Sequence, residues 1–365
     1  MRANGSADDV RRPPLDRRPL PPRLFFKWLR GRRARTIAFE LVAGVLALSI
    51  VLVAILPAHS AVFESHPSPA ASYSDAVDRI ARRQVADDRV AAPGGRSVFM
   101  THGMATARVI VLFHGFTNSP TQFEHLAALL FAAGDNVYVP RLPHHAERHG
   151  NARTLAHLTA QELRACADSA VDVARGLGDS VIVAGVSAGG TIAAWVAQYR
   201  PDVLRAVIVA PVFAIGRVPS FLDAPLMNLA LRIPNLSRSY APDSLRPDRE
   251  LGVSTRAIAQ LLVLGGAIRR AGDERPPKAR DIVFVLNAND HTVRAAPAVA
   301  LARRWSQEGA HVVAYEFPRS LGLPHDIAEE AHPSANPAVV YPALGALVRG
   351  EPAPAVLASH RLWPP

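Results

Sequence analysis

Short apolar runs alternate along most of the chain with longer segments whose apolar residues recur at helical spacing. Because the runs have no polar residue at every second position, they are typical of strands buried on both faces of a sheet. They predict six strands, at residues 108–113, 136–139, 180–184, 205–210, 281–286 and 311–317. The intervening periodicity predicts helices at residues 120–133, 159–177, 188–199, 295–308 and 336–348. The pattern therefore predicts an α/β fold, with a mostly parallel sheet covered by helices on both faces.

One long segment, residues 212–278, interrupts this alternation. It is too long for a simple connection. We expect an inserted cap over the carboxyl ends of the strands, where open α/β sheets bind their ligands. Its apolar run at residues 257–268 is equally consistent with an ordinary core helix. Four apolar residues of this segment are expected to line a substrate pocket: Phe213, Phe221, Leu226 and Met227.

The most apolar part of the chain lies near its N-terminus. Residues 41–56 are sixteen residues without a charge. With the apolar residues 37–39 the segment reaches about twenty, enough to span ~30 Å of hydrocarbon. We expect one transmembrane helix at residues 36–57. The arginines just before it, Arg30, Arg32, Arg33 and Arg35, predict a cytoplasmic tail and an exported remainder, hence a single-pass protein of the cytoplasmic membrane.

A cleavable signal peptide is the main alternative for this segment. Ala58-His59-Ser60 offers small residues suited to cleavage, and the protein would then be secreted. The long basic region and the long apolar run favour an uncleaved signal-anchor instead. A buried core helix would rarely follow an arginine cluster so closely.

The distribution of charge along the chain indicates which kind of binding partner to expect. A net charge of +10 first suggests nucleic acid, but residues 1–35 hold eleven of the 41 basic residues against three acidic ones, so this tail carries +8 of it. We therefore expect a membrane partner and no nucleic acid. The single cysteine, Cys166, excludes an intramolecular disulfide and a cysteine metal cluster. The hydrophobic fraction of 49% excludes a wholly disordered chain.

These observations predict five regions in order. A basic, Arg/Pro-rich cytoplasmic tail at residues 1–35 precedes the transmembrane helix at 36–57. A linker with a short helix follows at 58–92. The α/β domain occupies 93–350 and carries the cap at about 212–278, and a tail at 351–365 ends the chain.

The motif Gly185-Val186-Ser187-Ala188-Gly189-Gly190 follows a predicted strand and opens a predicted helix. A serine in such a sharp strand–turn–helix sits in strained backbone geometry with its hydroxyl presented at the sheet edge. Small residues two positions before and two after the serine permit close approach of neighbouring chain. The motif predicts Ser187 as a nucleophile.

A serine hydroxyl needs a base, and the base needs an orienting acid. Asp290 follows the strand at residues 281–286, and His325 follows the strand at 311–317. Both lie in loops at strand carboxyl ends, so both are expected to converge on Ser187. Asp281 starts its strand and would lie at the opposite edge, and His291 comes too early in the chain.

An oxyanion requires backbone donors. The amide of Ala188, at the start of the helix, is one candidate. The amide of Phe116 is the other, because His114-Gly115-Phe116 follows the first predicted strand. His114 precedes this turn, and we expect it to be structural.

In the order HGFTNSP, GVSAGG, NANDHTV and LPHD, these motifs resemble the α/β-hydrolase superfamily over about residues 97–348. HGFTNSP and the cap position are similar to the bacterial carboxylesterase and monoacylglycerol-lipase branch. The resemblance implies an α/β-hydrolase fold and a serine hydrolase that cleaves small-molecule or lipid acyl esters through an acyl-enzyme, without a cofactor. It implies Ser187 as nucleophile, Asp290 as acid and His325 as base, with Phe116 and Ala188 as oxyanion donors.

The resemblance leaves the substrate open. The same triad serves thioesterases, peptidases and acyltransferases, and a catalytically inactive hydrolase fold used as a binding module is the alternative from a different class. One departure from the pattern is Pro143-His144-His145, where many relatives have a Gly-His-Gly turn. It bears on the shape of this loop.

Four histidines gather in the same region and suggest zinc: His144, His145, His149 and His157. The Asp/Glu–His spacing of a metal-binding helix is missing, and Glu147 is the one carboxylate close by in the sequence. We therefore expect polar loop histidines near the rim of the site and no metal.

Overall fold

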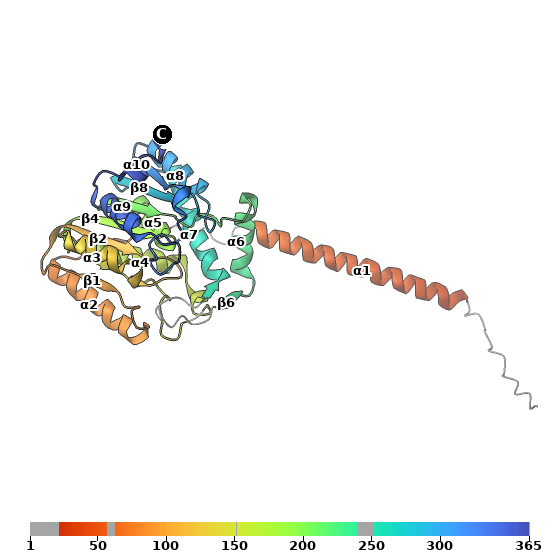
Figure 1. Ribbon diagram of the computed structural model, residues 1–365. Helices are drawn as coiled ribbons and strands as arrows, with labels where there is room; N and C mark the ends of the chain where they lie inside the picture. Colours follow the sequence, from red (N-terminus) through yellow and green to blue (C-terminus); the bar gives the residue numbers. More distant parts are fainter. Residues whose placement is uncertain (1–21, 57–62, 151, 240–251, 365) are drawn as a thin grey trace, which may run out of the picture. The chain divides into compact units, whose positions relative to one another are not determined.

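The computed structural model describes residues 22–56, 63–150, 152–239 and 252–364. The chain divides into two compact units, one ending at Leu52 and the other beginning at Val53 (Figure 1). The first contains most of helix α1 (Pro22–Ile55), and the second contains the sheet.

Helix α1 contains a stretch, Thr36–Ile55, of 20 residues with a mean hydropathy of 2.6 and no buried residue. Among the described residues this is the one helix long and apolar enough to cross a membrane, and a signal sequence would meet the same test. The helix begins at Pro22, before residue 36, where the expected transmembrane segment starts. Proline fits the first turn of a helix, and few of the residues that follow it have low helix propensity. The proposed cleavage site Ala58-His59-Ser60 and residues 1–21 of the tail lie outside the described residues.

The second unit is built on an eight-stranded sheet in the order β1-β3-β2-β4-β5-β8-β9-β10. The six central strands are parallel, and the two edge strands pair antiparallel with their neighbours. The strands are β1 (Val98–Met100), β2 (Thr106–Phe113), β3 (Asn136–Val139), β4 (Gly178–Val186), β5 (Val203–Val209), β8 (Asp281–Asn287), β9 (His311–Phe317) and β10 (Arg361–Trp363). The six predicted strands are confirmed; the edge strands, three residues each, carry too little pattern to be recognised.

Helices cover both faces of the sheet, as expected. The helices of this unit are α2 (Tyr73–Val90), α3 (Glu124–Ala132), α4 (Ala160–Ala174), α5 (Ala188–Tyr199), α6 (Asp223–Arg232), α7 (Thr255–Glu274), α8 (Ala296–Gln307), α9 (Pro337–Arg349) and α10 (Ala355–Ala358). Helices α3 and α9 pack together, whereas α4, α5, α7 and α8 form a second, continuous layer. Right-handed crossovers place these groups on opposite faces, since β3 and β4 lie on opposite sides of β2.

The segment expected to be a cap divides into two parts. After β5 the chain forms α6, then the short strands β6 (Ser237–Ser239) and β7 (Gly252–Ser254), which pair with each other. Helix α7 packs against both α5 and α6. The apolar run at residues 257–268 is therefore a core helix whose other side supports the cap.

Two regions expected to be linker and tail are part of the fold. The extended chain from Phe63 to Ala70 is fastened to α4: Ser65 Oγ donates to Asp168 at 2.5 Å, and the amide of Ser68 donates to Asp172 at 2.8 Å. Buried Arg200 neutralises both carboxylates. At the other end of the chain, β10 lies within the segment expected to be a tail. The short helix expected within residues 58–92 is α2, and both segments pack on the α/β domain through contacts between residues far apart in the sequence.

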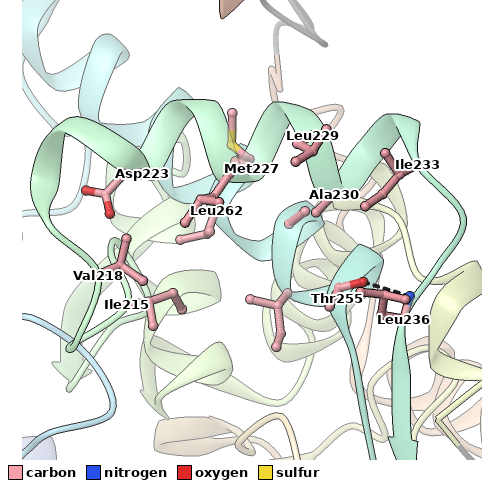
Figure 2. A pocket seen from close by; sticks show the side chains of 13 residues that line it. Ile215, Val218, Asp223, Met227, Leu229, Ala230, Ile233, Leu236, Thr255 and Leu262 are labelled. Atoms are coloured by element: carbon pink, nitrogen blue, oxygen red, sulfur yellow. Dashed lines mark hydrogen bonds between the residues drawn. The ribbon is translucent and has the colours of Figure 1, made fainter. Parts of the chain in front are cut away.

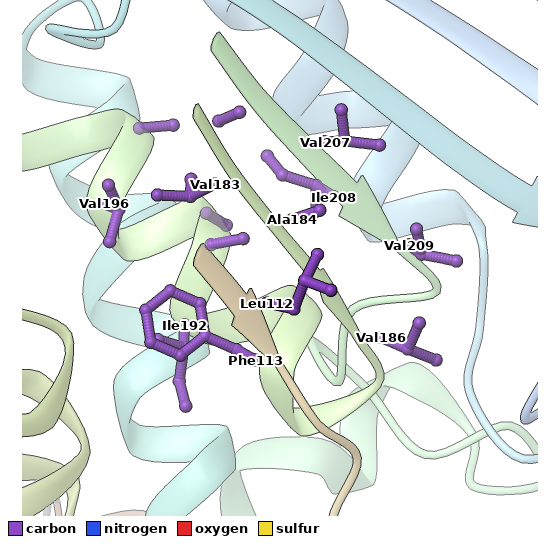
Figure 3. Close-up of a cluster of buried hydrophobic side chains, with 14 of the residues drawn as sticks. Leu112, Phe113, Val183, Ala184, Val186, Ile192, Val196, Val207, Ile208 and Val209 are labelled. Carbon is purple, nitrogen blue, oxygen red and sulfur yellow. The ribbon is translucent and has the colours of Figure 1, made fainter. Parts of the chain in front are cut away.

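The core lies between the central strands and helix α5. Figure 3 shows apolar side chains of these elements packed together, among them Leu112, Val183, Ile192, Val196 and Val207, all inaccessible to solvent. Every residue of α5 is buried. The helix that follows Ser187 is therefore held on all sides, so the turn before it is rigidly placed.

Candidate active site

The turn between β4 and α5 holds Ser187 at φ 59° and ψ −113°, a strained conformation for a residue with a side chain. The flanking glycines explain how the chain accommodates it. A Cβ added to Gly185 would lie 2.2 Å from the carbonyl oxygen of Gly189, and one added to Gly189 would lie 1.8 Å from the carbonyl oxygen of Phe113. Side chains at these two positions are excluded by backbone, as the spacing of small residues predicts.

Ser187, His325 and Asp290 form one hydrogen-bonded chain. The Oγ atom of Ser187 lies 2.8 Å from Nε2 of His325, and Nδ1 of His325 lies 2.6 Å from Oδ2 of Asp290. Since a carboxylate only accepts, Nδ1 carries the proton and donates to Asp290. Nε2 is then the acceptor that faces the serine hydroxyl, which is the arrangement a general base requires.

Asp290 is held as an anion by several donors. Its Oδ1 accepts from the backbone amides of Thr292, at 2.8 Å, and Val293, at 3.1 Å. Burial opposes the charge, but the hydrogen bond from His325 and these two amides outweigh it and lower the pKa of Asp290. The group is thus charged near neutral pH.

The three residues follow three parallel strands, β4, β8 and β9. Parallel strands end at the same edge of the sheet, which brings residues up to 138 positions apart into contact. Asp281 begins β8 and lies at the other edge, where it pairs with His311 and Arg205.

The Phe116 amide is oriented by the peptide group that contains it. The carbonyl oxygen of Gly115 accepts from Nδ1 of His114 at 2.9 Å and from the amide of Asn118 at 3.2 Å. Because a trans peptide is planar, its N–H points opposite to this fixed carbonyl. Nε2 of His114 accepts from the amide of Leu142 at 3.1 Å, which sets the tautomer. His114 therefore acts structurally in this geometry.

Ala188 is the first residue of α5. The first amides of a helix have no carbonyl partner within it. Its N–H and that of Phe116 are the two donors that the sequence assigned to an oxyanion.

The turn after β3 has glycine-like backbone conformations without glycine. His144 has φ 62° and Ala146 has φ 51°, on either side of His145. If Pro143-His144-His145 corresponded to the Gly-His-Gly turn, the glycine-like positions would be 143 and 145. The positive φ angles instead fall at residues 144 and 146, one position later. His145 is buried edge-on against His114 and Phe116, and burial lowers its pKa to about 4. It is neutral at physiological pH and packs as a flat, uncharged ring against the segment His114-Gly115-Phe116.

An apolar cavity of about 300 Å³ lies between α6 and α7 (Figure 2). Leu226 and Met227 line it, as expected, together with Ile215 and Leu262. Phe213 and Phe221 do not. Phe213 is buried in the core against Gly265, and Phe221 is 76% exposed because it lies on the outer side of the cap.

The cavity is close to the catalytic edge but its lining includes no triad residue. Ile215 at its wall pairs with Val293, three residues after Asp290. Asp223, at one end, forms an ion pair with Arg294.

One of the four histidines, His144, is held by a carboxylate. Nε2 of His144 lies 3.1 Å from Oε1 of Glu162, which also caps α4. Within the described ranges no group of three or more His, Cys, Asp and Glu side chains could hold a metal ion.

Sequence reasoning missed a set of polar residues beside the triad. Asp326 accepts hydrogen bonds from the side-chain amides of both Asn118 and Gln122. Asn118 and Asp326 stand inside the motifs HGFTNSP and LPHD, which was a usable signal. Gln122 carries no such signal.

Comparison with known proteins places this geometry in context. The model of a family described as "Alpha/beta hydrolase family" matches residues 110–360. A thermostable monoacylglycerol lipase from Bacillus sp. (strain H-257) is 29% identical over 192 residues, covering 50% of this chain and 71% of the lipase. A pyrethroid hydrolase from Sphingobium wenxiniae is 30% identical over 149 residues, covering 39% of this chain and 48% of the hydrolase.

Solved structures show the same fold. The Paleococcus ferrophilus monoacylglycerol lipase superposes with a TM-score of 0.53 at 19% identity, covering 70% of this chain and 98% of that one. A structure described under the metagenome-derived lipolytic enzymes LipS and LipT gives 0.53 at 17% identity, covering 72% and 100%.

Proposed function

Since this chain belongs to the alpha/beta hydrolase family and is a hydrolase of the lipase/esterase type, we propose that it cleaves carboxylic esters through a Ser187–His325–Asp290 triad and an acyl-enzyme intermediate. One observation carries the proposal: the continuous hydrogen bonds from Ser187 Oγ through His325 to Asp290, at 2.8 and 2.6 Å.

The reaction follows from the direction of these bonds. As Ser187 Oγ attacks the ester carbonyl carbon, its proton passes to Nε2 of His325, and Asp290 stabilises the imidazolium through Nδ1. The carbonyl oxygen becomes an oxyanion, for which the amides of Phe116 and Ala188 are the proposed donors. His325 then gives the proton to the leaving alcohol oxygen as the C–O bond breaks. Water repeats the sequence and releases the acid from Ser187.

The cavity favours an uncharged acyl chain as the bound part of the ester. Its lining is almost wholly apolar, with Leu226, Met227 and Leu262 among the residues that form it. Burying an unpaired charge there would cost several kcal/mol. The monoacylglycerol lipase relative supports the same class, so we propose lipid esters of neutral alcohols as substrates.

The decisive experiment replaces the proposed nucleophile. Ser187→Ala should lower kcat on p-nitrophenyl esters by roughly 10⁴-fold or more and abolish covalent labelling by a fluorophosphonate. Ser180→Ala, on the same strand but at its other end, is the matched control and should retain full activity. Activity of Ser187→Ala within tenfold of wild type would rule out the mechanism. A clear preference for thioesters, peptides or anionic esters would redirect the substrate class.

We further propose that α1 anchors the catalytic domain to the cytoplasmic membrane, with the domain outside. The apolar stretch Thr36–Ile55 and the arginines before it support this orientation. The protein should resist carbonate extraction from membranes, and external protease should degrade the domain while sparing the tail. Protection of the domain in right-side-out vesicles would refute the orientation, and release of a soluble domain beginning near Ala61 would indicate a cleaved signal sequence.

A further inference from the structure

Two loops that meet at the active site are joined by a polar cluster made of Asn118, Gln122 and Asp326. The Nδ2 group of Asn118 donates to one carboxylate oxygen of Asp326, and the Nε2 group of Gln122 donates to the other. Asn118 and Gln122 belong to the loop and helical turn after β2, whereas Asp326 follows β9. The contacts span 208 and 204 residues of sequence. We call these three residues the brace.

Burial fixes the orientation of the two side-chain amides of the brace. Asn118 is inaccessible to solvent and Gln122 is 3% exposed, so water does not compete for their amides. A carboxylate accepts hydrogen bonds and cannot donate them. Each amide must therefore present its nitrogen to Asp326, which leaves Oε1 of Gln122 facing the opposite way.

This Oε1 atom of Gln122 holds the segment His114-Gly115-Phe116, which carries the proposed oxyanion donor. Oε1 of Gln122 accepts from the amide of Gly115 at 2.7 Å. Gly115 supplies the carbonyl of the peptide whose N–H belongs to Phe116, and that carbonyl is pinned by His114 and Asn118. The brace thus grips this peptide from its amino side through Gln122 and from its carboxyl side through Asn118.

The other end of the brace touches the base. Asp326 is the neighbour of His325 in the chain, and the amide of Ile327 donates to the carbonyl of His325 at 3.1 Å. A displacement of Asp326 would therefore move His325 with it. The brace links the residue that moves the proton to the amide that faces the oxyanion.

We propose that Asp326 is a positioning residue that fixes the distance between His325 and the Phe116 amide during catalysis. This rests on the proposed function, since it assumes that His325 is the base and Phe116 an oxyanion donor. The reacting groups must hold their places while charge moves from the serine oxygen to the carbonyl oxygen. A carboxylate bound by two buried amides supplies this constraint without exchanging a proton with the substrate.

The hydrogen bonds allow a test by exchange of polarity. In Asp326→Asn one amide of the brace faces another amide, so one bond is lost. In Gln122→Glu two carboxylates face each other. The double variant restores the three bonds described above: the carboxylate introduced at position 122 would accept from Gly115 and from the amide introduced at position 326, and the oxygen of that amide would accept from Asn118. It moves the charge from one side chain of the brace to the other and keeps the number of bonds.

We expect each single variant to lower kcat on a p-nitrophenyl ester by about 10- to 100-fold, below the 10²–10³-fold cost of losing an oxyanion donor outright. KM should stay within about threefold, because the acyl cavity is untouched. The double variant should recover to within about fivefold of wild-type kcat. If Asp326 served the fold alone, the single variants would lose thermal stability, and kcat per folded molecule would stay unchanged.

Several outcomes would overturn the proposal. These are an Asp326→Asn variant with kcat within twofold of wild type, or a double variant that loses as much as the product of the single losses. Asp281→Asn, an ion-paired aspartate at the far end of β8, is the control and should leave kcat unchanged. If Asp326→Asn fails to fold, Asn118→Ala decides: it removes one donor, and an unchanged kcat would refute the brace.

The same experiment separates the brace from the proposed function. Wild-type protein that neither hydrolyses esters nor reacts with a fluorophosphonate would overturn the proposed function, and the role of the brace with it. An active wild type with a fully active Asp326→Asn variant would overturn the brace alone.

Discussion

Strands β8 and β9 carry an aspartate–histidine pair at each of their two ends. At the carboxyl end, Asp290 and His325 are 2.6 Å apart, and at the amino end Asp281 and His311 are 2.8 Å apart. The exposed fractions of the side chains differ: 6% and 16% for the first pair, 17% and 71% for the second. Residue type and distance alone therefore do not distinguish a catalytic pair from a surface pair.

The surroundings make the difference. His325 has a serine oxygen on its second nitrogen, and Asp290 accepts two backbone amides. Asp281 is instead neutralised by Arg205, which leaves His311 a partner whose charge is already balanced. The loops after the strands bring Ser187 and two backbone amides to the first pair, whereas the amino ends form surface ion pairs.

Backbone strain follows the same division. Among the described residues, the non-glycine residues with positive φ are His144, Ala146, Ser187 and Ala210. All four follow the carboxyl ends of β3, β4 and β5. At the amino ends, positive φ before β3 and β9 falls on Gly134 and Gly309. Strain has accumulated where the loops must meet a substrate, in keeping with its usual place at functional sites.

The largest contrast should appear in activity. Asp290→Asn should lower kcat by roughly 10⁴-fold, because the wrong tautomer of His325 would face Ser187. Asp281→Asn should change kcat by less than twofold. Steady-state kinetics on a neutral ester measures both. A crippling effect at Asp281 with a mild one at Asp290 would reverse the assignment of the acid.

A smaller contrast concerns pH and stability. The pKa of Asp290 is lowered in the folded protein, so its charge stabilises the fold above the pKa of an unfolded aspartate, about 3.9. This contribution is lost as pH falls through the folded pKa. The difference in thermal midpoint between Asp290→Asn and wild type should therefore shrink below about pH 4. Ser187→Ala keeps Asp290 and should follow the wild-type profile; a difference that grows with acidity would contradict the sign.

The smallest contrast tests strain. His144→Gly should change the free energy of unfolding by less than about 1 kcal/mol, because relief of a side chain at φ 62° offsets the loss of the hydrogen bond to Glu162. Gly134→Ala should lower it by about 1 kcal/mol, because it creates the same strain at φ 91° with no neighbour in contact. Thermal denaturation of the two variants measures the difference. Equal losses in both would show that strain is not concentrated at the catalytic end.

The central strands and the turn at Ser187 were predictable because their signals are local. A buried parallel strand is apolar throughout, and the glycines around Ser187 are required by backbone within a few residues of them. The pairing of Asp290 with His325 followed from their positions after strands, since parallel strands end together. Of the four residues expected to line a substrate pocket, Leu226 and Met227 line the cavity, whereas the side on which Phe213 and Phe221 lie depends on how α6 sits on α7.

The sequence by itself therefore determined the α/β class and the family, and it named Ser187, Asp290 and His325 as candidates, because each depends on periodicity or on motifs a few residues long. Tertiary structure alone decided that residues 63–90 and 361–363 join the fold, that the turn at His144 takes a glycine-like path, and that Asp326 reaches Gln122. These arrangements depend on contacts between residues that are far apart in the sequence, such as Gln122 and Asp326, which are separated by 204 positions. No local sequence pattern predicts such a contact, because the two residues meet only after the strands have assembled into the sheet.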